Sequence, residues 1–201
     1  MKIGILAIQG DFELHKLALD KLSIDSFYVR KIDDLDIIDA LVLPGGESTT
    51  ISKLLKKYKI FNPIKEFAKN KSIFGTCAGA ILMSRDSKDS RVNNLGCLDV
   101  VSSRNAWGSQ IDSFSDYIDL IDDPLFSKEY CATFIRGPRF LNVNASCTVL
   151  GTYNGEPVLI RSKKHLISSF HPAFLMRQPE QKKLAWIDLK MIREKSKTLK
   201  I

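Results

Sequence analysis

Two short apolar runs in this chain each lead through a glycine turn into a helix pattern, and this arrangement most constrains the fold. Leu41–Leu43 is followed by Pro44-Gly45-Gly46, and Ile73-Phe74 is followed by Gly75–Gly79. Strands that alternate with helices favour a parallel sheet covered by helices. In the second half strand-like runs follow one another, and Asn154-Gly155 indicates a hairpin turn. We therefore expect an α/β fold with a mostly parallel central sheet and added antiparallel strands.

The hydrophobic periodicity predicts the order of the elements. The first half is expected to hold strands Lys2–Ile8, Ser26–Arg30, Ala40–Leu43 and Ser72–Phe74, with helices Phe12–Leu22, Ala78–Ser84 and others between Ser48 and Asn70. A polar loop, Arg85–Asn94, precedes strands Cys97–Val101, Tyr117–Ile121, Cys131–Ile135, Cys147–Tyr153, Pro157–Ile160 and His165–Ser169, and a helix Pro179–Glu194. Without an internal repeat or a low-complexity linker, residues 1–201 are expected to form one domain.

The composition is that of a soluble globular protein of the cytoplasm. The chain has 201 residues, of which 44% are hydrophobic and 26% charged. No run approaches the roughly 20 apolar residues of a membrane-spanning helix, and the chain starts in a strand pattern rather than a signal peptide. Its four cysteines are widely spaced, so we expect free thiols and no metal site.

The net charge of +7 raises the question of a nucleic-acid partner. Lysines crowd the helix patterns between Lys53 and Lys71, but no aromatic residues suited to base stacking are interleaved with them. We interpret these lysines as a solvated helix face, which can also face an acidic protein partner, and we expect no nucleic-acid binding.

Cys77 has the surroundings of a nucleophile. It follows a strand pattern and precedes a helix pattern, and Gly75 and Gly79 supply the small neighbours that a sharp strand-to-helix turn needs. The helix start favours the thiolate form of the cysteine. The alternative is an inert buried cysteine in a glycine-flanked turn.

Two further segments offer the groups that such a nucleophile needs. His171 ends a strand pattern and is followed by Pro172, which places it where the loops of open α/β sheets gather. His15 and His165 are expected to be surface histidines. The turn Pro44-Gly45-Gly46 can direct backbone N–H groups toward an oxyanion, although alone it is a common turn.

Together these segments resemble the class I glutamine amidotransferases, and most closely the PdxT/SNO family of glutaminase subunits of pyridoxal phosphate synthase. The similarity extends over nearly the full chain. The matching segments are Ile8–Phe12, Leu43–Thr50, Phe74–Gly79, Arg104–Phe114 (with Gly108, Gln110 and Asp112), Phe134–Arg136 and Ser169–Pro172.

The resemblance implies a three-layer, flavodoxin-like domain that hydrolyses L-glutamine to glutamate and ammonia. Cys77 would attack the side-chain amide, His171 would shuttle protons, and the backbone at Gly46 and Ala78 would stabilise the oxyanion. The glutamine pocket implied by the resemblance consists of Gly46, Glu47, Ser48, Arg104, Ile135 and Arg136. No metal or organic cofactor is implied. The implied partner is a PdxS-type synthase subunit, which docks around Gln9-Gly10-Asp11 and receives the ammonia.

One position departs from the family pattern. Ala173 stands where the family has the glutamate that orients the histidine, and nothing in the sequence shows that Glu180 can reach back. Removing the acid costs a serine triad about 10⁴ in turnover, and a cysteine–histidine pair less because a thiol ionises more readily. The alternative to an active enzyme is therefore a weakened or inactive glutaminase, and we expect Ala173→Glu to raise turnover if the acid is the missing part.

Two other classes of function remain open. The first is the glutaminase of another pathway, such as imidazole glycerol phosphate synthesis, and the segment Arg104–Phe114 speaks against it. The second is a non-catalytic protein that keeps the fold and the docking surface, which Ala173 favours.

Overall fold

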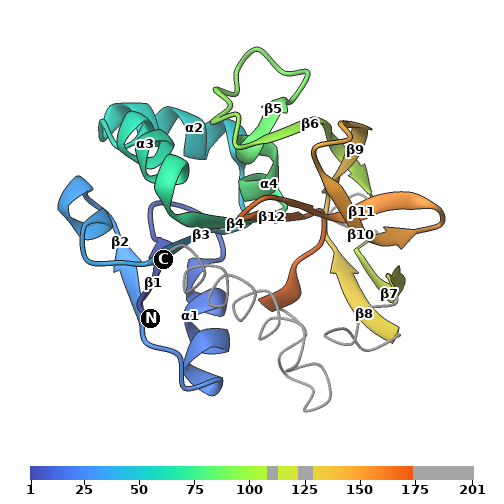
Figure 1. Cartoon of the computed structure of the whole chain (residues 1–201), viewed down its shortest axis with the longest axis horizontal. Coiled ribbons are helices and arrows are strands. Elements are labelled where there is room, and N and C mark those ends of the chain that lie inside the picture. Colours follow the sequence, from blue (N-terminus) through green and yellow to red (C-terminus); the bar gives the residue numbers. More distant parts are fainter. Residues whose placement is uncertain (108–112, 122–128, 174–201) are drawn as a thin grey trace.

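Parallel strands form the centre of the molecule, and antiparallel strands extend the sheet on one side (Figure 1). The computed structural model describes residues 1–107, 113–121 and 129–173. Its helices are α1 (Phe12–Lys21), α2 (Ser48–Lys57), α3 (Phe61–Asn70) and α4 (Ala78–Met83), with a 3₁₀ helix over Ile32–Leu35. Its strands are β1 (Ile3–Leu6), β2 (Ser26–Val29), β3 (Ala40–Leu43), β4 (Ser72–Thr76), β5 (Ser84–Asp86), β6 (Leu98–Trp107), β7 (Phe114–Leu120), β8 (Glu129–Phe134), β9 (Gly137–Val143), β10 (Thr148–Tyr153), β11 (Glu156–Ser162) and β12 (His165–Ser168).

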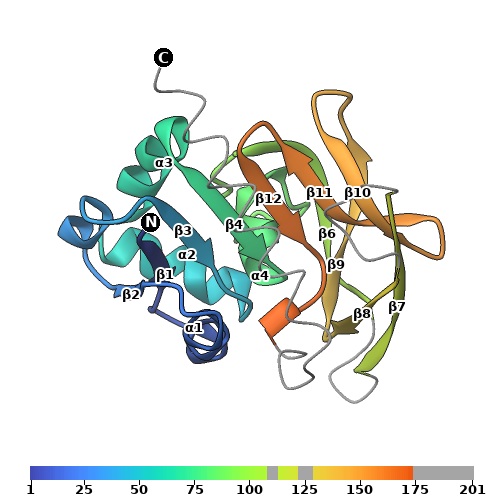
Figure 2. The same cartoon turned by 60° about the horizontal axis from the view of Figure 1, so that its bottom comes forward.

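Within these ranges a nine-stranded sheet has the order β2-β1-β3-β4-β12-β11-β10-β7-β8, and a three-stranded sheet has the order β5-β6-β9. The strands from β2 to β12 in the large sheet pair in parallel, and those from β12 to β8 pair in antiparallel fashion. This confirms the predicted mixed α/β sheet with a parallel core. Figure 2 shows the antiparallel strands beside the parallel ones.

The interior parallel strands β1, β3, β4 and β12 are buried on both faces. On β3, Leu41 and Leu43 belong to the large core cluster that α2, α3 and α4 complete, whereas Val42 packs with Leu19 of α1. Accordingly, α1 lies on one side of these strands and the other three helices lie on the opposite side (Figure 1). Covered faces explain why the strands are continuous apolar runs rather than alternating ones.

The second half differs from the sequence prediction in several places. Strand β9 was not expected, because Gly137-Pro138 has the composition of a turn. It lies at the end of the small sheet, where a proline leaves no central ladder bond unmade. The hairpin at Asn154-Gly155 is confirmed, since both residues have positive φ and join β10 to β11. The predicted helix Pro179–Glu194 lies outside the described residues.

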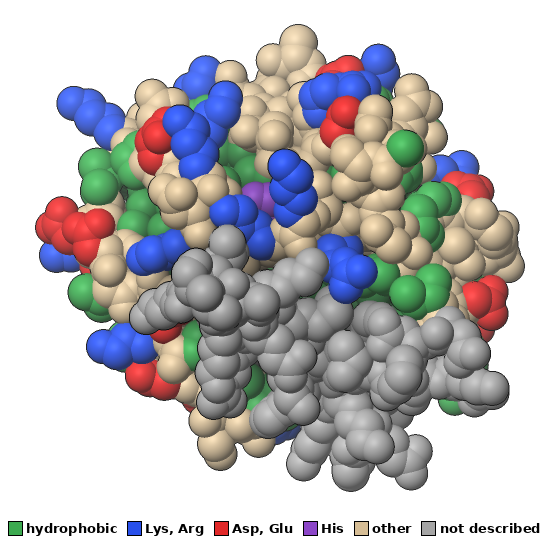
Figure 3. All heavy atoms as spheres, viewed as in Figure 1, with side chains coloured by type: hydrophobic (Ala, Val, Ile, Leu, Met, Phe, Trp, Pro, Cys, Tyr) green, Lys and Arg blue, Asp and Glu red, His purple; other side chains and the backbone are tan. Residues whose placement is uncertain are grey.

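The surface agrees with the interpretation of the lysine-rich helices as a solvated face. Lys53, Lys56, Lys57, Lys65 and Lys69 are all exposed. Basic side chains are spread over the face in Figure 3 rather than joined into one stripe. None of the helices in the described ranges combines the length and apolar character that crossing a membrane requires.

Candidate active site

The ends of neighbouring parallel strands bring the predicted site segments together. β4 pairs with β3 on one side and with β12 on the other, so the residues that follow these three strands meet at one edge of the sheet. β1 pairs with the far side of β3, and its following segment, Gln9–Asp11, reaches the same edge. Asp11 is held there because its N–H donates to the Gly45 carbonyl at 3.1 Å.

Cys77 occupies a sharp turn between β4 and α4. Its φ is +48° and its ψ is −103°, a backbone conformation that residues other than glycine rarely adopt. Cys77 lines the pocket from this turn. The turn is held by a hydrogen bond from the Cys77 N–H to the Ser168 carbonyl at 2.9 Å. Gly79 must be glycine, since a side chain there would collide with the Leu43 backbone. Cys77 is 5% exposed, and its Sγ lies 3.8 Å from the Ile135 carbonyl oxygen.

His171 follows β12 and lies beside Cys77 and Asp11. Its N–H donates to the Thr133 carbonyl at 2.9 Å, which anchors the backbone to β8. In the side chain, Nδ1 lies 2.9 Å from Oδ2 of Asp11. The two side chains are 7% and 14% exposed, so this pair is shielded from water.

The electrostatics of this pair favour an imidazolium beside a carboxylate. Burial lowers the pKa of His171, but the charge of Cys77, hydrogen bonds with Asp11 and Cys77, and the charge of Asp11 together raise it to about 10. Burial raises the pKa of Asp11, but the hydrogen bond from His171 and the charges of His15 and His171 hold it below its usual range. At neutral pH both groups are therefore ionised.

The other two histidines are buried, contrary to the expectation that they lie on the surface. His15 is 5% exposed, and its Nε2 lies 3.2 Å from Thr76 Oγ1. Burial lowers its pKa to about 4, although the charge of Asp11 opposes this shift. His165 is 7% exposed, accepts the Ile73 N–H at Nδ1, and has a pKa lowered by burial to about 4. Both predictions were wrong because His15 lies on the side of α1 that faces the sheet, where it contacts Thr76, and His165 starts an interior strand of the sheet.

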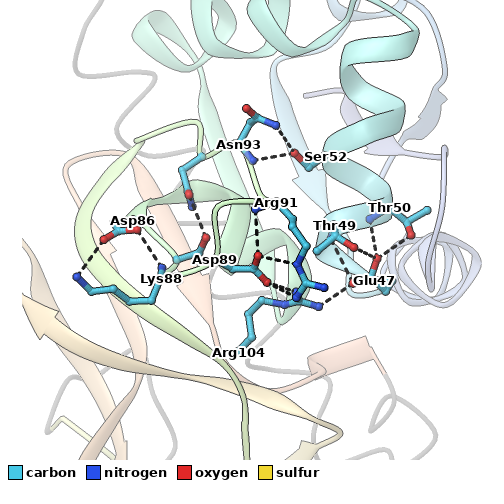
Figure 4. A network of polar contacts seen from close by, with 12 residues as sticks. Glu47, Thr49, Thr50, Ser52, Asp86, Lys88, Asp89, Arg91, Asn93 and Arg104 are labelled. Atoms are coloured by element: carbon cyan, nitrogen blue, oxygen red, sulfur yellow. Dashed lines mark hydrogen bonds and ion pairs between the residues drawn. The ribbon is translucent and has the colours of Figure 1, made fainter.

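Glu47 and Arg104 also line the site, and Figure 4 shows the ion pair that joins them. The Glu47 carboxylate caps α2 by accepting hydrogen bonds from the backbone N–H groups of Thr49 and Thr50. It also accepts hydrogen bonds from the hydroxyl groups of both threonines. Burial raises the pKa of Glu47, but these hydrogen bonds outweigh it and lower the pKa to about 2. Arg104 donates to Glu47 at 2.7 Å and also forms an ion pair with Asp89. Arg104 thus joins β6 to the turn before α2 and to the loop that contains Asp89.

A pocket of about 280 Å³ opens in front of Cys77. Its lining combines the thiol, the histidine and most of the residues predicted to bind substrate: Asp11, Gly46, Glu47, Ser48, Cys77, Ile81, Arg104, Ile135, Arg136 and His171. Arg136 is exposed and has a positive φ of +48° in the turn after β8. Ala78 is buried at the first position of α4, behind the thiol. Among the described residues, no group of three or more His, Cys, Asp or Glu side chains is placed to hold a metal ion.

Ala173 does not line this pocket. It is 8% exposed and packs with Ala18 of α1, beside a separate cavity of about 20 Å³ whose lining is apolar except for His15. A carboxylate nevertheless lies beside His171, because Oδ2 of Asp11 is 2.9 Å from Nδ1. Of the other predicted matches, Gly108, Gln110 and Asp112 lie outside the described residues, and so does Glu180, the acid nearest along the chain.

Asp11 is the site residue whose contact with His171 the sequence did not reveal. An acid directly before a helix is most simply interpreted as its N-cap, and Asp11 does occupy that position without making a side-chain cap hydrogen bond. The one available signal was the resemblance, which implies a glutamate at position 173, where this chain has alanine, and so calls for a carboxylate at the end of a neighbouring strand.

Three comparisons place the chain among known proteins. The model of the SNO glutamine amidotransferase family matches residues 5–186. The pyridoxal 5'-phosphate synthase subunit PdxT of Thermosipho africanus is 43% identical over 86% of this chain and 90% of the relative, and PdxT of Oenococcus oeni is 43% identical over 86% and 88%. A crystal structure of a glutamine amidotransferase has a TM-score of 0.85 and 36% identity, covering 94% of this chain and 98% of the other.

Proposed function

Because the chain belongs to the SNO glutamine amidotransferase family, we propose that it is the glutaminase subunit of a pyridoxal phosphate synthase. It hydrolyses L-glutamine and delivers the ammonia to a PdxS-type synthase subunit for vitamin B6 biosynthesis. The observation that carries this proposal is the pocket in which Cys77 and His171 stand together against a wall of polar groups. The relatives named PdxT, at 43% identity, support the choice of pathway.

In the proposed reaction the nucleophile is the Cys77 thiolate and the acid is the His171 imidazolium. The Cys77 thiolate attacks the side-chain amide carbon of glutamine, and the C=O electron pair moves onto oxygen. The backbone N–H groups of Gly46 and Ala78 stabilise that oxyanion. When the tetrahedral intermediate collapses, His171 protonates the leaving nitrogen and ammonia departs, which leaves a γ-glutamyl thioester. Water then attacks the thioester, His171 takes up its proton, and glutamate is released.

The remaining pocket residues recognise the amino-acid end of glutamine. Arg136 is exposed and forms no ion pair within the described part of the chain, so its planar guanidinium is available for a carboxylate. Arg104 is already bound to two carboxylates, and it acts chiefly by fixing Glu47 in the wall of the pocket. Ser48 and Ile135 contribute a hydroxyl and an apolar edge.

The two arginines can be separated by experiment. Arg136→Ala should raise KM for glutamine about tenfold and leave the melting temperature nearly unchanged, since the side chain is exposed. Arg104→Ala should lower the melting temperature as well, because it leaves Glu47 and Asp89 without their shared cation. Equal changes in melting temperature for the two variants would contradict this division of roles.

Docking of the synthase subunit is proposed at Gln9-Gly10-Asp11. The Gln9 side chain accepts the Glu47 N–H at 3.0 Å, so this segment is coupled to the turn that contains Gly46. A side chain at position 46, where φ is +153°, would collide with Gln9 and Gly10. Glycine at this position therefore allows the turn after β3 to stay in contact with the turn after β1. A partner that binds against Gln9 can therefore move the Gly46 N–H into position to stabilise the oxyanion and so activate the glutaminase.

Release of ammonia and glutamate from L-glutamine, with and without the synthase subunit, tests the proposal. We expect equal amounts of both products, strong stimulation by the synthase subunit, and no turnover by Cys77→Ala with the same partner. A complex that forms but releases no ammonia would instead favour a docking protein without catalysis. That alternative rested on an unsupported histidine, and the contact between Asp11 and His171 removes its main argument.

A further inference from the structure

We propose that Asp11 is the residue that positions His171 and stabilises its charged form in this protein, in place of the acid missing at position 173. His171 Nδ1 and Asp11 Oδ2 are 2.9 Å apart, and both side chains are buried. The proposal rests on the proposed glutaminase function for its kinetic test, whereas its test by alkylation does not need turnover.

The local structure directs the Asp11 carboxylate to the histidine rather than to the helix. Asp11 stands at the N-cap of α1 but makes no side-chain cap hydrogen bond. Its backbone is fixed by the bond to the Gly45 carbonyl and by Gly10, whose φ of +105° suits glycine. The chain turns here so that the carboxylate enters the space between the ends of β1, β3 and β12.

Gly45 shows how closely the pair is enclosed. A Cβ at this position would lie 2.8 Å from His171 Nδ1 and 3.1 Å from Asp11 Oδ1, so only glycine leaves room for both groups. The second carboxylate oxygen, Oδ1, is buried and has no hydrogen-bond partner among the described residues. Burying a carboxylate with one oxygen that lacks a hydrogen-bond partner costs free energy. The contact between the other oxygen, Oδ2, and His171 offsets that cost.

Position 173 supplies nothing that substitutes for this contact. Ala173 faces α1 and the cavity of about 20 Å³. Asp11 therefore accepts the Nδ1–H of His171 and fixes the ring tautomer, so that the other nitrogen, Nε2, serves Cys77.

Several charged or titratable groups surround His171 and enter any pH profile. Asp11 and His15 face it from the start of α1, Cys77 from the turn before α4, and Glu47, Arg104 and Arg136 from the walls of the pocket. Among them, Asp11 is the carboxylate in hydrogen-bond contact with the imidazole.

Asp11→Asn is the decisive variant, because asparagine has nearly the same size and is an equally good N-cap. With the synthase subunit bound, we expect kcat to fall about 10- to 10³-fold while KM changes less than about threefold. In the full chain alone, the rate at which iodoacetamide alkylates Cys77 at pH 7 should fall about tenfold, because the imidazolium beside the thiol loses the carboxylate that stabilises it. Asp20→Asn, a change to an exposed carboxylate on the same helix, should alter neither result.

Measuring both kcat and alkylation of Cys77 distinguishes a failure of the proposed role of Asp11 from a failure of the proposed glutaminase function. An alkylation rate and a kcat equal to those of the unchanged protein would overturn the role of Asp11. If the unchanged protein with its partner releases no ammonia, the glutaminase proposal fails, and the alkylation rate alone decides on Asp11: a lower rate in Asp11→Asn supports its role and an equal rate overturns it. Should Asp11→Asn not fold, Asp11→Ser, which also retains an N-cap, is measured in the same way.

Discussion

His171 and His15 occupy two buried regions that share Asp11 as a neighbour, yet their pKa values differ by about six units. His15 lies under α1, where its ring contacts the Thr76 hydroxyl, and burial keeps it neutral. His171 lies at the strand ends, where its ring contacts the Asp11 carboxylate directly and Cys77 lies on its other side. Depth alone would make both rings neutral.

The comparison shows that the charge of a buried histidine depends on the groups in direct contact with it. His165 supports this conclusion, since it is also buried, contacts a backbone N–H, and has a pKa lowered to about 4. The charged state of His171 is therefore a property of the site and not of its position in the fold.

Removing the thiol should have the largest effect. Cys77→Ala should abolish glutamine hydrolysis, a loss of at least about 10⁴, because no other group in the pocket can form the thioester. The same change should lower the pKa of His171, since the charge of Cys77 helps to raise it. A histidine titration that is unchanged in Cys77→Ala would show that Asp11 alone sets the charge.

Acid should destabilise the protein through the neutral histidines. The folded-state pKa values of His15 and His165, about 4, lie below the ordinary 6.5, so the unfolded chain binds more protons between these pH values. Stability should therefore fall as pH decreases from about 6.5 to about 4, by on the order of 3 kcal/mol for His15. His171 acts in the opposite sense, because its raised pKa adds stability that is lost as pH rises toward 10.

Urea unfolding at several pH values measures this dependence. His165→Gln, which lies outside the pocket, should reduce the loss of stability in acid. A free energy of unfolding that is equal at pH 7 and pH 4.5 would contradict the description of both rings as buried and neutral.

Moving the carboxylate should have a smaller effect. Adding Ala173→Glu to Asp11→Asn places an acid where the resemblance implies one, and we expect turnover to recover about tenfold relative to Asp11→Asn. Recovery without a change in KM would indicate that His171 needs a carboxylate from either side. An absence of recovery would mean that Asp11 contributes more than a hydrogen-bond acceptor.

Ala173→Glu alone should have the smallest effect on turnover. Since Nδ1 of His171 is already occupied by Asp11, we expect a change of less than about threefold instead of the gain that the sequence suggested. Stability should fall by about 1–3 kcal/mol, because the cavity of about 20 Å³ beside Ala173 is nearly apolar. A gain of tenfold or more in glutamine hydrolysis would show that Asp11 leaves the histidine poorly oriented.

The sequence predicted the parts of the site that a single segment defines. The turn at Cys77 combines a strand end, a helix start and small neighbours within a few residues, and the turn at Gly45-Gly46 does the same. The parallel half of the fold was predictable for a related reason, because strands buried on both faces are continuous apolar runs. Strand β9 was missed because Pro138 at the edge of a small sheet resembles a turn residue.

The partner of the histidine was not predictable from local pattern. Asp11 and His171 are separated by 160 positions, and only the order of the parallel strands brings them together. In the sequence, Asp11 is most simply interpreted as the N-cap of a helix. Ala173, in turn, suggests that the histidine has no acid to orient it. The burial of His15 was hidden in the same way, since the sheet that covers it is distant in sequence.

A histidine NMR titration tests the central claim most directly, because the chain contains three histidines. Ring resonances of the full chain, assigned with His15→Gln and His165→Gln, would be followed from pH 4 to pH 10. We predict that His171 stays protonated through neutral pH, with its Nδ1–H bound to Asp11, while His15 and His165 stay neutral down to about pH 4. A His171 ring that is neutral at pH 7 would contradict both its ion pair with Asp11 and its role as the acid in the proposed glutaminase reaction.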